Sequence, residues 1–254
     1  MDLKAWWPWY RKIVHAFGYD PKHDQYAADL LSTLLDGVAL SLSRFKELIS
    51  NKTILVFGAG PSLEATLRQL LEYAVLNHFT LISANGATSA LLDIAGEAPD
   101  IVVTDLDGRI DDLLKANEAG ALMAIHGHGD NIHLLKEYVP KFGNVIGTTQ
   151  RKPRPNVYNF GGFTDGDRAA FLASEMEAKA VVLAGMDFGH EAGPYSKTNT
   201  WSIDVKRLKL QWGRQLLEWL STRTNIPLYN LRSHGENIVG FTNVSAKYLL
   251  NLIS

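Results

Sequence analysis

Residues 53–74, TILVFGAGPSLEATLRQLLEYA, contain an apolar run, a glycine-rich turn and an amphipathic stretch in direct succession. The run at 53–57 has the length and β-branched content of a strand, whereas Leu63, Leu67 and Leu70 recur at helical spacing. A strand joined so closely to a helix is half of a βαβ unit, whose strands are parallel. This stretch therefore predicts an α/β fold.

Further apolar runs of strand length follow along the chain, each with glycine, aspartate or another turn residue close behind it. They are FTLISA (79–84), DIVVT (100–104), ALMAIH (121–126), NVIGTT (144–149), VYNF (157–160), KAVVLA (179–184) and PLYNL (227–231). Nearly continuous apolar strands are typical of sheets buried on both faces. We predict a mostly parallel β-sheet flanked by helices, in a Rossmann-like architecture.

The two ends of the chain have helical patterns. Leucine and alanine recur at helical spacing within residues 21–50, which predicts an N-terminal helical segment at 1–50 ahead of an α/β domain at 51–254. A long helix is expected at 202–224 and a short one at 246–252. The aromatic side chains upstream are expected to pack on the core or on a second subunit, which allows a homodimer, whereas stacking on a ligand is the competing hypothesis; they are Trp6, Trp7, Trp9 and Tyr10.

The composition argues against several classes of protein. The net charge of −2 lacks the strongly basic character of general nucleic-acid binders, and the absence of cysteine excludes disulfides and thiolate metal sites. No apolar run approaches the roughly 20 residues that span a bilayer. Because the N-terminus also lacks the apolar core of a signal peptide, a cytoplasmic location is expected.

Open parallel sheets bind ligands outside the carboxyl ends of their strands, so the residues after each run are candidate site residues. After the first run come Gly58, Gly60, Pro61 and Ser62, whose backbone N–H groups at a helix start suit phosphate. This turn matches neither the P-loop nor the dinucleotide fingerprint. A tight strand-to-helix connection without a ligand explains it equally well.

Asp105 and Asp107 directly follow a buried run, two residues apart. Extended geometry aims both carboxylates the same way, about 7 Å apart, where they repel by roughly 2 kcal/mol at an effective dielectric near 20. A divalent cation reverses that cost, and all-oxygen ligands favour Mg²⁺ or Mn²⁺. Two solvated turn aspartates are the simpler alternative.

The run HGHGDN (126–131) permits two hypotheses. It is similar to the HxHxDH motif of metallo-β-lactamase-type zinc hydrolases, but Asn131 replaces the final histidine. We favour the second hypothesis, in which Asp130 joins the magnesium site and His126 and His128 donate hydrogen bonds to phosphate oxygens.

Asp165, Asp167 and Arg168 begin a predicted helix after the double glycine at 161–162. Ordinary N-capping by Thr164 or Asp165 explains part of this composition. The functional hypothesis assigns Asp165 to the metal, Asp167 to proton acceptance and Arg168 to phosphate.

Two more strand ends complete the candidate site. Asn85 and Gly86 are expected to contact the nucleotide, and Asp187 suits the N–H donors of a flat heterocycle on which Phe188 stacks. Basic groups available for a polyphosphate are Arg109, Arg151, Lys152, Arg154, Arg168 and Lys197.

Taken together, the motifs FGAGPSL, SANGA, PDIVVTDLDG, HGHGDN, GGFTDGDRA and LAGMDFG resemble those of the archaeal-type 6-hydroxymethyl-7,8-dihydropterin pyrophosphokinase family, over residues 51–189. That family is distantly similar to the catalytic domain of thiamin pyrophosphokinase. The resemblance implies Mg-dependent transfer of diphosphate from ATP to the hydroxymethyl group of a reduced pterin, with release of AMP, in tetrahydromethanopterin or folate-type cofactor synthesis. By analogy it gives metal binding to Asp105 and Asp107, completed by Asp130 and by Asp165 or Asp167.

Two other functions remain open at this point. The same core is similar to motility-associated factors that look like glycosyltransferases, in which Asp-x-Asp and a metal hold a sugar nucleotide. A non-catalytic nucleotide-binding module is the second, although it leaves the clustered carboxylates without a purpose.

Overall fold

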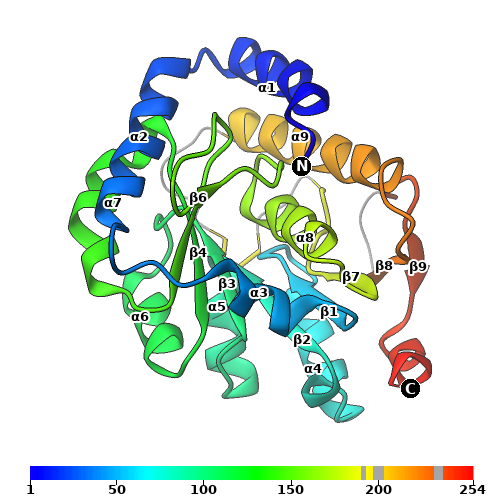
Figure 1. Ribbon diagram of the computed structural model, residues 1–254. Coiled ribbons are helices and arrows are strands. Elements are labelled where there is room, and N and C mark those ends of the chain that lie inside the picture. The colour runs from blue at the N-terminus through cyan, green and yellow to red at the C-terminus, as the bar shows by residue number, and fades with distance from the viewer. Residues whose placement is uncertain (190–192, 197–202, 232–236, 254) are drawn as a thin grey trace.

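The computed structural model describes residues 1–189, 193–196, 203–231 and 237–253 (Figure 1). Within them, nine strands form one sheet in the order β6-β5-β4-β3-β2-β1-β7-β8-β9, and every neighbouring pair is parallel. The predicted α/β fold with a mostly parallel sheet is confirmed. The strands are β1 (Thr53–Phe57), β2 (Thr80–Ala84), β3 (Ile101–Thr104), β4 (Leu122–His126), β5 (Val145–Thr148), β6 (Val157–Tyr158), β7 (Ala180–Ala184), β8 (Leu228–Leu231) and β9 (Thr242–Val244).

Each predicted apolar run contains one of these strands, and β9 is the addition. Its sequence, TNV, has no apolar run, and two of its three residues are exposed at the edge of the sheet. Burial on both faces is what makes a strand apolar, so an edge strand of three residues has no such signal.

The helices that flank the sheet begin where the sequence supplies caps. Asp2 and Asp20 accept hydrogen bonds from the backbone at the starts of α1 and α2, and Gly18 closes α1 in the left-handed conformation. The helices are α1 (Leu3–Phe17), α2 (Pro21–Leu34), α3 (Leu42–Ile49), α4 (Leu63–Glu72), α5 (Ala87–Ala90), α6 (Ile110–Glu118), α7 (Ile132–Tyr138), α8 (Asp165–Glu175) and α9 (Ile203–Ser221). A 3₁₀ segment, Ala246–Leu252, stands where a short C-terminal helix was predicted.

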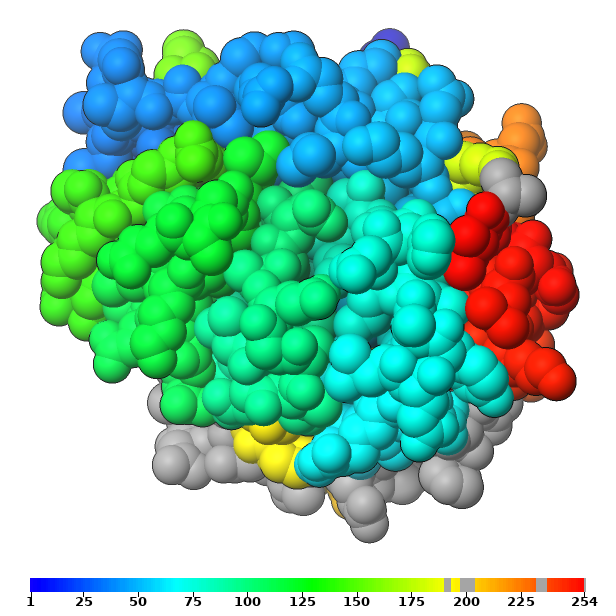
Figure 2. Space-filling model, turned by 90° about the horizontal axis from the view of Figure 1, so that it is seen from below, coloured from blue at the N-terminus to red at the C-terminus, as the bar shows by residue number. Residues whose placement is uncertain are grey.

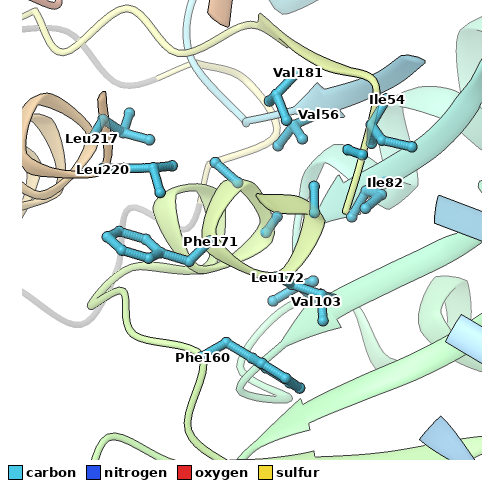
Figure 3. Packing of buried hydrophobic residues seen from close by; sticks show 14 of the residues in the cluster. Ile54, Val56, Ile82, Val103, Phe160, Phe171, Leu172, Val181, Leu217 and Leu220 are labelled. Carbon is cyan, nitrogen blue, oxygen red and sulfur yellow. The ribbon is translucent and has the colours of Figure 1, made fainter. Parts of the chain in front are cut away.

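Alternating side chains of the strands pack on two helical layers. Ile54 and Val56 of β1 belong to a core shared with α1, α3, α8 and α9, while Leu55 and Phe57 face α4. Figure 3 shows α8 between the sheet and α9, with Phe171 and Leu220 close together. Figure 2 shows the opposite layer, where α4 to α7, coloured cyan to green, cover most of the surface.

The N-terminal aromatic residues pack on the core of their own chain. Trp6 is 0 % exposed, and its ring lies 6.4 Å from that of Trp219 on α9. Trp7 and Trp9 are half-buried against the same core. Packing on the core was one of the two predicted alternatives, and Trp6 confirms it.

The strand order creates one position suited to a ligand. From β1 the chain winds outward through β2 to β6 and then returns to place β7 on the other side of β1. The crevice outside the carboxyl ends of β1 and β7 is therefore the topological switch point, where open α/β sheets bind ligands. Among the residues that the structure describes, none of the helices combines the length and apolar character needed to cross a membrane.

Candidate functional site

A cleft of about 260 Å³ opens at the carboxyl edge of the sheet, at this switch point. Because all strands are parallel, their C-terminal turns line it in sheet order: β5, β4, β3, β2, β1 and β7. Helix α9 and the link between α1 and α2 supply further residues. The lining includes Tyr19, Gly58, Gly60, Pro61, Asn85, Gly86, Asp105, Asp107, His126, His128, Gln150, Phe163, Asp165, Arg168, Asp187, Phe188, Lys206 and Lys209.

Asp105 and Asp107, at the centre of the cleft, converge on one amide. Asn85 Nδ2 donates to Asp105 Oδ1 at 3.3 Å and also to Asp107 Oδ1. The amide is itself oriented by Thr104, whose hydroxyl donates to Asn85 Oδ1 at 3.1 Å. The sequence predicted that the two carboxylates point the same way, and the shared donor shows that they do.

The backbone around this pair is strained. Asn85 and Leu106 adopt positive φ angles of 44° and 66°, and Phe188 after β7 adopts 51°. Left-handed backbone is costly for side-chain-bearing residues, above all for a bulky leucine, and such strain is concentrated at functional sites. The buried Leu106 side chain anchors the turn that presents the flanking carboxylates.

Asp105 is held ionised by its surroundings. Burial by itself raises the pKa of its carboxyl group. His128, whose Nε2 lies 3.5 Å from Asp105 Oδ2, and hydrogen bonding from Asp107 lower the pKa by more than burial raises it, so the net pKa falls below its ordinary value. Its neighbour His126 is buried, contacts Thr148 Oγ1 at 3.1 Å and has its pKa lowered by burial and by Arg168. His126 is therefore neutral and mainly structural.

Asn131 connects the ends of β3 and β4 through hydrogen bonds of its side chain. Its Nδ2 donates to the carbonyls of Asp105 and His126, both at 2.7 Å, and its Oδ1 accepts from the N–H of His128 at 3.0 Å. The residue that departs from the zinc-hydrolase motif is thus a structural amide, which argues against that hypothesis. Asp130 lies 3.9 Å from His128 Nδ1 and does not line the cleft.

The glycine turn differs from the phosphate cradle that we predicted. The N–H groups of Gly58 and Gly60 donate to carbonyls of Ala184 and Gly185, each at 2.8 Å, and that of Ser62 donates to Asp187 Oδ2 at 2.9 Å. These N–H groups are therefore not free to bind phosphate. A Cβ on Gly60 would lie 2.3 Å from Asp187 Oδ2 and 2.5 Å from the Gly185 carbonyl, so the turn needs glycine for close packing against β7.

The start of α8 also corrects one prediction. Asp167 is buried and accepts from the N–H of Phe163 at 2.9 Å and from the N–H and hydroxyl of Thr164 at 2.6 Å. A carboxylate that accepts three hydrogen bonds inside a capping box stabilises the turn, so Asp167 is not positioned to accept a proton from a substrate. Asp165, in contrast, lines the cleft, and burial together with the charge of Asp105 raises its pKa well above the ordinary value.

Arg168 is a fully buried cation at the cleft wall. Two of its guanidinium nitrogens donate to the carbonyls of Gly162, at 3.3 Å, and Phe163, at 3.0 Å, whereas its Nε has no hydrogen-bond partner among the described residues. Burial lowers its pKa, and the charges of Asp165 and Asp167 oppose that effect. Its charge therefore balances the acidic cleft.

Two lysines in the cleft were not predicted from the sequence. Lys206 and Lys209 stand one turn apart on α9, and burial lowers the pKa of both. Their spacing of three residues on one helical face was the available signal. Of the basic residues predicted to bind phosphate, only Arg168 lines the cleft among those that the structure describes, and Lys197 lies outside the described residues. Arg154 pairs instead with Asp29 at 2.6 Å and Arg109 with Asp112 at 3.1 Å, whereas the guanidinium of Arg151 lies over the rings of Trp7 and Tyr10.

A network from the N-terminal helices was also missed. Asp24 of α2 accepts hydrogen bonds from Tyr10, from the N–H of Gly129 and from Gln150 Nε2, at 2.8, 2.9 and 2.8 Å. Trp6 Nε1 donates to the Gln150 carbonyl at 2.9 Å. No local pattern links residues so far apart in the chain, yet they set one wall of the cleft.

The cleft carries a metal-compatible pair; of the other two predicted ligands, Asp165 lines the cleft and Asp130 does not. Over the described ranges, no three histidine or acidic side chains surround a common point. Mg²⁺ in nucleotide sites is usually held by one or two protein carboxylates together with substrate phosphates and water. The chemistry of the convergent pair Asp105 and Asp107 fits that mode of binding.

The protein is an open parallel α/β protein whose cleft at the carboxyl edge of the sheet contains paired carboxylates and half-buried lysines. A family model described as "6-hydroxymethylpterin diphosphokinase MptE-like" matches residues 29–193. The chain belongs to this family, whose name describes a diphosphotransferase.

Curated relatives and a solved structure agree with this class. Proteins named 6-hydroxymethyl-7,8-dihydropterin pyrophosphokinase are similar to this chain: that of Pyrococcus furiosus is 47 % identical, covering 87 % of this chain and 94 % of its own. Those of Methanothermobacter thermautotrophicus and Methanocaldococcus jannaschii are 41 % and 37 % identical, each covering 89 % of this chain and 98 % of its own. The MAf glycosyltransferase of Magnetospirillum magneticum AMB-1 shares the fold with a TM-score of 0.55 at 15 % identity, over 87 % of this chain and 39 % of that one.

Proposed function

We propose that this protein transfers diphosphate from ATP to 6-hydroxymethyl-7,8-dihydropterin, giving AMP and the pterin diphosphate, as a Mg-dependent step of tetrahydromethanopterin or folate-type cofactor synthesis. One observation carries the proposal: Asp105 and Asp107 converge on Asn85 inside a single cleft that also contains Lys206 and Lys209. The names of relatives 37–47 % identical to the chain support the same acceptor.

The reaction is a nucleophilic displacement at phosphorus. The hydroxymethyl oxygen of the pterin bonds to the β-phosphorus of ATP and its proton passes to solvent, while the bond from that phosphorus to the α,β-bridging oxygen breaks and AMP leaves with that oxygen and the electron pair of the bond. Such transfers depend on positioning and charge neutralisation more than on covalent catalysis. The cleft residues therefore need only hold two substrates and balance the phosphate charge.

The acidic pair and the lysines divide this work. Asp105 and Asp107 would hold Mg²⁺, which when bound draws negative charge from the transferred phosphates. Lys206 and Lys209, half-buried on α9, supply positive charge from the other side of the cleft, where low exposure strengthens each interaction. Arg168 balances the carboxylates from within the wall. The glycine turn packs closely against the residues after β7, and Asn85 and Gly86 line the cleft beside it, where they would contact the nucleotide.

Product analysis tests the reaction class directly. Incubation of the protein with Mg-ATP and 6-hydroxymethyl-7,8-dihydropterin should yield equal amounts of AMP and pterin diphosphate, and EDTA should stop the reaction. Formation of ADP, or of AMP without an equal amount of pterin diphosphate, excludes diphosphate transfer. The shared fold of a glycosyltransferase gives the rival outcome, in which the protein binds a sugar nucleotide and ignores ATP.

A further inference from the structure

The side chain of Gln150 has an unused acceptor at the β5 end of the cleft. Gln150 is only 3 % exposed and lines the cleft. Its Nε2 donates to Asp24, but its Oε1 has no hydrogen-bond partner among the described residues. Leaving a buried amide oxygen unpaired is unfavourable, and native proteins seldom do so without a reason. A donor on a bound ligand would supply the missing partner.

The position of this oxygen is set by the N-terminal helices. Trp6 of α1 holds the Gln150 carbonyl, and Asp24 of α2 fixes the orientation of the amide by accepting from its nitrogen. Tyr10 in turn donates to Asp24. With Nε2 committed to a carboxylate, Oε1 is presented as an acceptor and the amide is not free to turn over. The arrangement therefore recognises an N–H group.

Aromatic rings stand in the same part of the cleft. Tyr19, in the link between α1 and α2, and Phe163, before α8, both line it, with ring centroids 6.4 Å apart. Phe17 stacks on Tyr19 from behind at 5.4 Å and lies 5.0 Å from Phe163. Such a cluster offers aromatic, apolar surface on which a planar ring can pack.

The order of the strands separates this region from the glycine turn. Gln150 follows β5, the carboxylate pair follows β3 and the glycine turn follows β1. With neighbouring strands about 4.8 Å apart, β5 and β1 are separated by roughly 19 Å, with β3 midway between them. Two substrates that meet at the acidic pair would therefore approach it from opposite sides.

We propose that Gln150, Tyr19 and Phe163 form the subsite for the planar heterocycle of the acceptor substrate, with Gln150 Oε1 accepting a ring or amino N–H and the aromatic side chains packing on the ring. The inference rests on the proposed function, since it names the place of the pterin in that reaction. It replaces the expectation that Asp187 and Phe188 bind the pterin, because Asp187 already accepts from Ser62 and follows β7, on the other side of the acidic pair from Gln150.

Equilibrium binding separates this subsite from the reaction. Calorimetry would measure the affinity of 6-hydroxymethyl-7,8-dihydropterin in the presence of Mg²⁺ and a non-hydrolysable ATP analogue, so that no turnover occurs. Gln150→Met should weaken pterin binding about tenfold, the scale of one hydrogen bond to a buried group. The affinity for the ATP analogue should stay within twofold of wild type. The matched control is Gln69→Met, which changes an exposed glutamine of α4.

A second pair of variants tests the aromatic contact without altering the buried amide. Tyr19→Ala should weaken pterin binding by about tenfold, whereas Tyr19→Phe, which keeps the ring, should stay within threefold. Wild-type pterin affinity in both Gln150→Met and Tyr19→Ala overturns the subsite while leaving the proposed function intact. If the wild-type protein binds no pterin at all, the subsite and the proposed function both fail.

Discussion

The two sides of the cleft are built in different ways. On the β1-to-β3 side, each candidate residue lies in the turn that ends its own strand, as Asp105 and Asp107 do after β3. On the β5 side, Gln150 is oriented by Asp24 and Trp6, which are 126 and 144 residues away in the sequence. A turn at a strand end supplies charge wherever the sheet forms, whereas a recognition surface of this kind requires the N-terminal helices to be docked.

Because the two sides are built differently, substitutions on each side are expected to change different properties of the protein. Substitutions in the acidic pair should remove activity and leave the fold intact, because the charges contribute no packing. Substitutions among the N-terminal helices should instead change stability and substrate affinity together. Variants on the two sides of the cleft test this distinction, and the largest effect is expected on activity.

The largest effect is expected for the acidic pair. Asp105→Asn or Asp107→Asn should lower turnover by at least about a hundredfold, the scale on which key electrostatic groups contribute. The fold should survive, but Asp105→Asn should lower thermal stability modestly, since His128 and Asp107 favour the ionised form of Asp105 in the folded protein. Asp111→Asn, on the exposed face of α6, is the control for charge alone. Turnover near that of wild type in both site variants would remove the pair from the mechanism.

The glycine turn should show a smaller effect through packing. Gly60→Ala brings a methyl group against the Gly185 carbonyl and Asp187, so a loss of about 1–3 kcal/mol in the free energy of unfolding is expected. Gly189→Ala, whose added Cβ would have no atom of the described residues within 4 Å, should cost little. Denaturant titration of both variants decides the point, and equal stability would show that β1 and β7 approach less closely than described.

The N-terminal anchor comes next. Trp6→Phe removes the donor to the Gln150 carbonyl along with part of a buried ring, which should cost about 2 kcal/mol of stability. Pterin affinity should fall with it. Trp7→Phe, in the same helix but half-buried, is expected to have a markedly smaller effect. A Trp6 variant with lowered stability but unchanged pterin affinity would uncouple the helices from the β5 side.

The smallest effect concerns Asp165 and the pH. Its pKa in the folded protein is raised by burial and by Asp105, so the native state retains a proton that the unfolded chain releases. Stability in EDTA should therefore decline as pH rises from 5 toward 8, because the native state binds more protons across that interval. Asp165→Asn should flatten this decline, and Asp111→Asn should not. Identical slopes for wild type and Asp165→Asn would show that the carboxyl group is not buried in solution.

Much of the fold could be predicted from local pattern. Apolar runs gave the positions of β1 to β8, and helical spacing gave α2, α3 and α9, because burial on both faces or on one face dictates those patterns. The short edge strand β9 escaped, since exposed residues carry no such constraint. At the site, the spacing of Asp105 and Asp107 after a strand was enough to predict their common direction.

Local sequence specifies which chemical groups lie at the carboxyl edge of the sheet, because each strand and its following turn are consecutive residues. Which of those groups are available to a ligand depends on the folded arrangement. The N–H groups of Gly58 and Gly60 donate to carbonyls at the end of β7, and Asp167 accepts from the start of its own helix. The Gln150 nitrogen donates to Asp24, which leaves its amide oxygen as the available acceptor. Hydrogen-bond capacity is shared among segments that meet only on folding, so availability depends on neighbours that no local stretch of sequence contains.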